Sequence, residues 1–162
     1  ESEARIAMLA IQLGMLEDAV RLYTSCGRFD LLNKMYQAAS RWDEALQLAK
    51  ESDRIHLSST YYEYAKHLEA AGQIERAVNA FEMAGTHRTD VPRVLFAAGR
   101  IDELRAYIDR KDDAELHKWW AKYAESVGDY ESALRYYDRA ADQLARVRIL
   151  CFQDRLDDAA EL

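Results

Sequence analysis

The stretch Gly128-Asp-Tyr-Glu-Ser-Ala133 is one of six copies of a short motif that decides the fold of this chain. Each copy has a turn-forming residue, two spacers, one or two carboxylates and then usually Ala. The other copies begin at Gly14, Ser40, Gly72, Gly99 and Asp154, so successive starts are 26, 32, 27, 29 and 26 residues apart. A motif that returns at such a period is typical of a solenoid, in which small units stack to bury a shared core.

The residues around each motif predict a helix, a turn and a second helix. Upstream of Gly72, four side chains have the i, i+3, i+4, i+7 spacing of a buried helix face: Tyr61, Tyr64, Ala65 and Leu68. Thr60 and Glu63 predict a capping box at the start of this helix, and Gly72 predicts its left-handed end. Three small or aromatic residues predict the buried face of the second helix: Ala77, Phe81 and Ala84.

Residues 128–140 resemble the second helix of a tetratricopeptide (TPR) repeat. The TPR positions for Gly, Asp, Ala, two aromatics and a final Ala are occupied by Gly128, Asp129, Ala133, Tyr136, Tyr137 and Ala140. Most of the spacings are shorter than the ~34 residues of a TPR, and its terminal Pro is missing, so the units are TPR-like. The sequence therefore predicts an all-α fold, a right-handed α-solenoid of about six TPR-like helical hairpins over residues 1–162. Because neither end has a polar cap, we expect this range to be a segment of a longer array.

Composition and charge restrict the partners. The chain is 49% hydrophobic and 31% charged, which is ordinary for a soluble domain. A net charge of −7 argues against binding to a phosphate backbone, and so against the pentatricopeptide repeats that bind single-stranded RNA. The longest uncharged run, residues 6–16, is too short to span a bilayer, and we interpret it as a buried first helix. Cys26 and Cys151 are predicted to be free thiols.

Acidic side chains recur at the start of each second helix, where a catalytic and a structural interpretation compete. The paired carboxylates are Glu17-Asp18, Asp43-Glu44, Asp102-Glu103 and Asp157-Asp158. The helix dipole stabilises a carboxylate in the first helical turn by ~0.3–1 kcal/mol. A pair that returns once per structural unit is therefore interpreted as structural rather than as a catalytic acid pair.

Two further stretches have a functional and a plain interpretation. Residues 109–115 are acidic enough to suggest a calcium loop, but they lack the Gly and the ligand pattern of an EF-hand. We interpret them as a solvated loop between helices. Residues 85–90 are the most loop-like stretch of the chain, and we interpret them as a connector rather than a contact loop.

No residue is predicted to be catalytic, to bind a cofactor or to bind a metal. The four histidines, His56, His67, His87 and His117, do not have the spacing of a zinc site. The glycine-rich motifs that bind nucleotide phosphates do not occur either. We therefore expect a protein that is not an enzyme.

Tryptophan provides the one candidate for partner binding. Trp42 lies inside a motif and is predicted to be core. In residues 116–127, five side chains form an apolar stripe at helical spacing: Leu116, Trp120, Tyr123, Ala124 and Val127. Trp119 points about 100° away from Trp120, toward a polar face with Glu115, Lys122 and Ser126. Trp119 either packs at the edge of the next hairpin or anchors a partner, because exposed Trp is enriched at interface hot spots.

Several stretches resemble the TPR-like region of the intraflagellar transport protein 140 family, a subunit of complex A. They are residues 31–45 and 53–57, Thr60-Tyr61, residues 86–88 and 91–93, and Trp119-Trp120-Ala121. The resemblance implies a non-enzymatic scaffold that serves dynein-driven retrograde transport and the ciliary entry of membrane proteins. It implies other complex A subunits and ciliary cargo adaptors as partners, and the cytoplasmic side of the cilium, at the axoneme and basal body, as the location.

The remaining expectations concern the other partners. We expect no nucleic acid, no transmembrane segment, and end-to-end self-association through apolar surface at the terminal hairpins. A coat or adaptor α-solenoid of vesicle trafficking remains the alternative function, because only the family resemblance separates the two.

Overall fold

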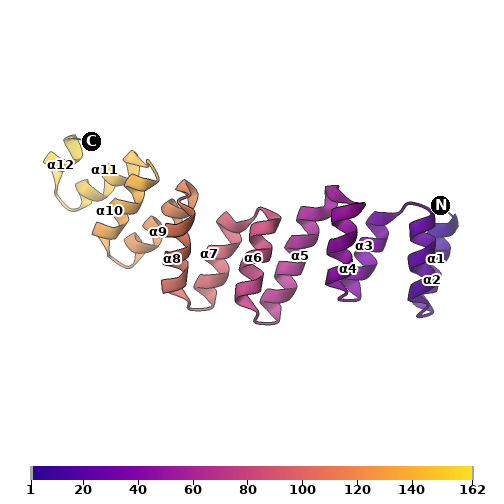
Figure 1. Cartoon of the computed structure of the whole chain (residues 1–162). Helices are drawn as coiled ribbons and strands as arrows, with labels where there is room; N and C mark the ends of the chain where they lie inside the picture. The colour runs from indigo at the N-terminus through magenta and orange to yellow at the C-terminus, as the bar shows by residue number, and fades with distance from the viewer. Residues whose placement is uncertain (1, 162) are drawn as a thin grey trace. The chain divides into compact units, whose positions relative to one another are not determined.

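The computed structural model describes residues 2–161, which form twelve α-helices and one short 3-10 helix with no strand (Figure 1). The helices are α1 (Ser2–Gln12), α2 (Leu16–Ser25), α3 (Phe29–Ala38), α4 (Trp42–Glu51), η1 (Arg54–His56), α5 (Leu57–Ala70), α6 (Ile74–Ala84), α7 (His87–Ala97), α8 (Ile101–Lys111), α9 (Ala114–Ser126), α10 (Tyr130–Arg139), α11 (Gln143–Phe152) and α12 (Leu156–Ala160). Each odd-numbered α-helix is joined to the next by a three-residue turn. The prediction of an all-α fold built from six TPR-like hairpins is confirmed over the described residues.

The repeated motif marks the turn inside every hairpin. Its first residue has a positive φ in all six copies, from 56° at Ser40 to 80° at Gly128. In the third hairpin the Gly72 N–H donates to the Glu69 carbonyl at 2.9 Å, and the Gln73 N–H donates to the Leu68 carbonyl at 2.9 Å. The other five turns repeat both hydrogen bonds. This is the Schellman arrangement, which satisfies the last carbonyls of a helix and ends it.

The sixth motif position explains the preference for a small residue. Ala19, Ala45, Ala77 and Ala133 are completely buried, as is Leu104, which occupies this position in the fourth hairpin. A small side chain there lets the second helix approach the first closely. Of the other residues expected to be buried around the third turn, Tyr64 is only half-buried, and the remaining five are buried: Tyr61, Ala65, Leu68, Phe81 and Ala84.

The chain divides into two compact units, residues 1–87 and residues 88–162. In the first unit a core cluster is built from small residues of α1 and α2 with Tyr23, Leu32 and Met35. In the second unit the completely buried apolar side chains include Leu104, Ile108 and Leu116. None of the described helices combines the length and the apolar character needed to cross a bilayer.

The predicted capping box at Thr60 is wrong. Helix α5 begins three residues earlier, at Leu57, directly after the 3-10 turn η1. Thr60 is completely buried; its hydroxyl donates to the His56 carbonyl at 2.7 Å and accepts from the Asn33 amide at 3.0 Å. The Thr and Glu spacing was a coincidence, because Thr60 connects α5 to α3 rather than capping a helix.

Two predicted loops are shorter than expected. Helix α8 continues to Lys111 and α9 begins at Ala114, so only two residues of the acidic stretch 109–115 lie outside a helix. Helix α7 begins at His87, which leaves Gly85 and Thr86 as the connector in residues 85–90. Charged residues do not by themselves end a helix; the backbone turns left-handed at Asp112 (φ 50°) and Gly85 (φ 78°).

Three expectations about the core also change. Helix α1 buries only Ala4, Ala7 and Ala10, whereas Ile6, Met8, Leu9 and Leu13 are more than half exposed, so the first helix is not buried throughout. Val127 is 59% exposed because α9 ends at Ser126. Trp42 is half-buried and packs against the rings of Tyr64 and His67, with centroids 5.5 and 5.2 Å away.

Candidate protein-binding surface

The two neighbouring tryptophans of α9 have different surroundings. Trp120 is 7% exposed and its ring lies 6.0 Å from that of Tyr136 on α10, so the prediction that it is core is confirmed. Trp119 is half-buried. Its ring stacks on Tyr123 at 6.0 Å and meets the edge of Phe96, on α7, at 6.0 Å. Trp119 thus packs against the preceding hairpin while part of its surface reaches solvent.

Trp119 lines a hollow between α7 and α9. The other lining residues are Arg88, Thr89, Glu115, Lys118 and Lys122, and the volume is about 480 Å³. Of the three neighbours predicted for Trp119, Glu115 and Lys122 line this hollow with it, whereas Ser126 does not. Charged side chains dominate this hollow, and Trp119 supplies its aromatic surface.

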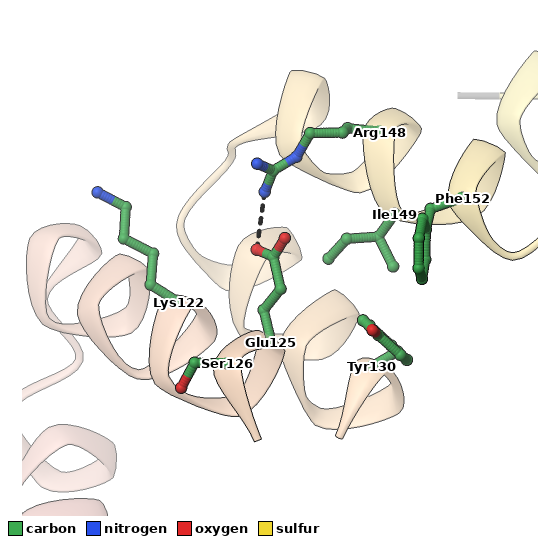
Figure 2. Close-up of a pocket in the computed structure, with 7 residues that line it drawn as sticks. All are labelled: Lys122, Glu125, Ser126, Tyr130, Arg148, Ile149 and Phe152. Atoms are coloured by element: carbon green, nitrogen blue, oxygen red, sulfur yellow. Dashed lines mark hydrogen bonds and ion pairs between the residues drawn. The ribbon is translucent and has the colours of Figure 1, made fainter. Parts of the chain in front are cut away.

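A second hollow adjoins the first at Lys122. Figure 2 shows its seven lining residues, which come from α9, α10 and α11 and enclose about 460 Å³: Lys122, Glu125, Ser126, Tyr130, Arg148, Ile149 and Phe152. Glu125 and Arg148 meet across it, and the rings of Tyr130 and Phe152 lie side by side with centroids 5.6 Å apart. We call the surface formed by these two hollows the α9 groove.

Two aspartates at helix starts hold basic residues of the α9 groove in place. Asp113 caps α9, because its Oδ1 accepts from the backbone N–H groups of Glu115 and Leu116, and its Oδ2 binds Arg88 at 2.8 Å. Asp142 caps α11, because its Oδ1 accepts from the backbone N–H of Ala145, and its Oδ2 binds Lys118 at 3.1 Å. Each aspartate joins one hairpin to the preceding one.

The pKa values of both aspartates are lowered. Burial raises the pKa of Asp113, but the Arg88 hydrogen bond and the two backbone N–H groups together outweigh it. For Asp142 the backbone N–H of Ala145 is the larger cause and Lys118 the second. Both carboxylates are therefore held in the charged form by a helix N-terminus and a cation together.

Glu125 is a third carboxylate that binds both a basic residue and another group of the protein. Its Oε2 accepts from the Tyr137 hydroxyl at 2.9 Å and from Arg148 at 2.7 Å. Burial, and then the hydrogen bond to Glu125, raise the pKa of Tyr137 to about 12. Tyr137 is almost completely buried, so Glu125 joins the core of the fifth hairpin to the surface of α11.

The paired carboxylates, His117 and the cysteines, also singled out in the sequence, lie outside the α9 groove. The paired carboxylates lie in the first turns of α2, α4, α8 and α12, as predicted. His117 is buried, with Nε2 2.9 Å from Asp112 Oδ1, and Cys26 and Cys151 are free. Within residues 2–161 no group of three or more His, Cys, Asp or Glu is arranged to hold a metal ion.

Sequence reasoning singled out Trp119 and Lys122 but missed two other basic residues of this hollow, Arg88 and Lys118. Arg88 and Lys118 lie 25 and 24 residues before the aspartates that they bind. The signal in the sequence was Asp directly before a helix, at Asp113 and Asp142, which predicts an N-cap. Nothing in the sequence showed that the second oxygen of each aspartate would bind the preceding hairpin.

The fold agrees with a comparison with known protein families. Residues 1–162, the whole chain, match the family model of the TPR domain shared by intraflagellar transport proteins 140 and 172. The match confirms the resemblance to intraflagellar transport protein 140 and the TPR-like nature of the hairpins. This chain therefore belongs to the family of TPR domains of intraflagellar transport proteins 140 and 172.

Proposed function

We propose that the chain is a binding segment of an intraflagellar transport complex A subunit, acting in retrograde ciliary transport and in the ciliary entry of membrane proteins. The observation that carries the proposal is the family match over residues 1–162. As a member of this family the chain is a TPR scaffold domain related to intraflagellar transport, and the family is a protein-interaction rather than a catalytic one.

The proposed partners are other complex A subunits and ciliary cargo adaptors, met on the cytoplasmic side of the cilium at the axoneme and basal body. Trp119 is the proposed contact residue. On one side it meets the aromatic cluster with Phe96 and Tyr123, which fixes the ring, and on the other it meets the open hollow beside Lys118 and Lys122. A rigid, partly exposed Trp loses little conformational entropy on binding, which is typical of a hot spot.

Affinity capture from ciliated cells tests this proposal. The tagged chain is expected to retain complex A subunits, and Trp119→Ala is expected to reduce their recovery while the purified variant stays helical by circular dichroism. Trp42→Ala is the matched control, since Trp42 is also half-buried in an aromatic cluster but lies in residues 1–87. Recovery of vesicle coat subunits in place of complex A subunits would favour the coat or adaptor alternative.

A further inference from the structure

We propose that the α9 groove binds an acidic segment of a partner protein that also carries an aromatic or large aliphatic side chain. The inference rests on the proposed function, because it names the chemistry of a partner at the same surface. It is carried by the way in which three ion pairs are oriented.

In each of the three ion pairs the carboxylate lies inward and the cation outward. The side chains of Asp113, Asp142 and Glu125 are 18%, 20% and 29% exposed, whereas those of their partners Arg88, Lys118 and Arg148 are 59%, 40% and 62% exposed. The inward carboxylates are also bound by backbone N–H groups or by Tyr137. The anions are thus bound within the protein, and the cations meet the solvent.

Lys122 adds an exposed positive charge to both hollows, with Glu115 as the carboxylate beside it in the first hollow. It is exposed and lines both hollows, and among the described residues it forms no ion pair. The groove is lined by four basic and two acidic side chains, although residues 88–162 contain 13 basic and 16 acidic residues. A positive surface on an acidic chain is complementary to an acidic segment and unfavourable to a basic one.

The apolar lining of the groove indicates that the partner segment also carries an apolar side chain. Tyr130, Ile149 and Phe152 line the second hollow, and Phe152 is 73% exposed. A hollow of about 460 Å³ is within the range of sites that receive a compact apolar group. Trp119 offers a second aromatic contact at the other end of the groove. An apolar side chain flanked by carboxylates would therefore match both the apolar lining and the outward cations of the groove.

A nucleic acid or an anionic membrane fits this surface less well. Glu115 and Glu125 lie among the cations and would repel a phosphate backbone, and the chain as a whole carries a net charge of −7. Binding to anionic lipid typically requires clusters of about 4–8 Lys or Arg at an exposed surface. The groove has only four basic side chains, the lower end of that range, and two carboxylates lie among them.

Peptide binding to the whole chain tests the inference. The probe is a short fluorescent peptide of Asp and Glu with two Phe residues one helical turn apart, measured by anisotropy. We expect it to bind at least about tenfold more tightly than the same peptide with Lys in place of the acids, or with Ser in place of Phe. Binding should weaken with added salt, since exposed charges are screened. Equal or tighter binding of a single-stranded oligonucleotide or of phosphatidylserine vesicles would overturn the inference.

A matched pair of charge reversals locates the binding. Lys122→Glu should weaken the acidic Phe peptide about tenfold or more. Arg21→Glu makes the same change in net charge on α2, where the Arg21 side chain is 77% exposed, and should leave the affinity unchanged. Both variants replace exposed side chains, and thermal unfolding checks that they fold. Equal weakening by both would mean that net charge alone attracts the peptide, and the groove would have no part in it.

The two proposals fail separately. If no acidic peptide binds but Trp119→Ala still loses complex A subunits in cell capture, the inference about the groove is wrong and the proposed function stands. If the peptide binds as described but complex A subunits are not recovered, the proposed function fails and the chemistry of the groove stands.

Discussion

At the scale of single residues, adjacent tryptophans on α9 show how one helical step changes the role of a side chain. Trp120 is buried against Tyr123 and Tyr136, whereas Trp119 contacts Phe96 and lines a hollow. The difference follows from the rotation of about 100° per residue in a helix.

This difference predicts unequal costs of truncation. Trp120→Ala should lower the free energy of unfolding by about 3–5 kcal/mol through the cavity it leaves. Trp119→Ala should cost clearly less, because water already reaches part of its ring. Urea unfolding followed by circular dichroism measures both. Equal and large losses would make Trp119 a structural residue and remove the support for its role as a contact.

Asp113 makes a pH-dependent contribution to stability. Its folded pKa is lowered, so this contribution is complete above the unfolded value of about 4 and is lost as the pH falls through the lower folded value. Asp113→Asn keeps an N-cap oxygen but removes the titration, so the urea midpoint should fall less steeply between neutral pH and strong acid. Asp113→Ala also loses the cap and should cost about 0.5–2 kcal/mol at neutral pH. An Asn variant as acid-sensitive as the parent would contradict this account.

Most residues of the candidate site could not be predicted from the sequence. Helical spacing was sufficient to separate Trp119 from Trp120, because both belong to one regular element. The groove, by contrast, depends on contacts between hairpins, such as Lys118 with Asp142. It also depends on which member of each ion pair is exposed, and that property arises only when the hairpins pack.

At the scale of elements, the turn inside each hairpin carries the fold. Six turns have the same pair of hydrogen bonds and the same positive φ at the first motif residue, although that residue is Gly in four copies, Ser in one and Asp in one. A positive φ is the feature that a turn-forming residue in the sequence predicts. This explains why the number of hairpins and their turns followed from the sequence.

The ends of the helices were predicted from the sequence less accurately than the turns. The charged residues Asp109, Arg110 and Lys111 suggested a loop, yet they complete the last turn of α8. Asp109 accepts hydrogen bonds from Tyr136 and Arg139 of α10, so a tertiary contact stabilises this helix end. Local charge does not reveal such a contact.

The turn geometry predicts opposite effects for two substitutions. Gly128→Ala should destabilise the chain by about 1–2 kcal/mol, since φ is 80° and nothing but backbone conformation opposes a Cβ there. Ala141→Gly should stabilise it by a similar or smaller amount, because Ala141 already has a φ of 55° in the turn between α10 and α11. Thermal and urea unfolding of the two variants measure both signs. A stabilising Gly128→Ala would be incompatible with the left-handed turn.

At the scale of the whole molecule, apolar side chains are exposed at both ends of the described sequence. In residues 6–15 Ile6, Met8, Leu9, Leu13 and Met15 are at least 50% exposed, and toward the other end Leu144 and Leu156 are 85% and 61% exposed. Apolar surface gathered in this way is typical of an interface.

We therefore predict concentration-dependent association of the purified chain. The apparent mass in sedimentation velocity should rise from micromolar to millimolar concentration. The double substitution Leu9→Lys and Leu13→Lys should suppress the rise, because a charge at each position opposes burial of the surface. Ile55→Lys is the control: Ile55 is 91% exposed but lies in η1, away from these segments in sequence. A chain that stays monomeric throughout the range would show that this surface does not self-associate.

The local closure of every hairpin turn has a consequence for how such a chain can evolve. Each turn is completed by hydrogen bonds that span at most five residues, as from Asp129 to Ala124, so a hairpin needs no distant segment to end its first helix. A duplication or deletion of one hairpin would therefore preserve every remaining turn and disturb only the two helix faces at the join. Gain or loss of a whole hairpin is therefore a change that leaves the backbone geometry of the other hairpins as it was.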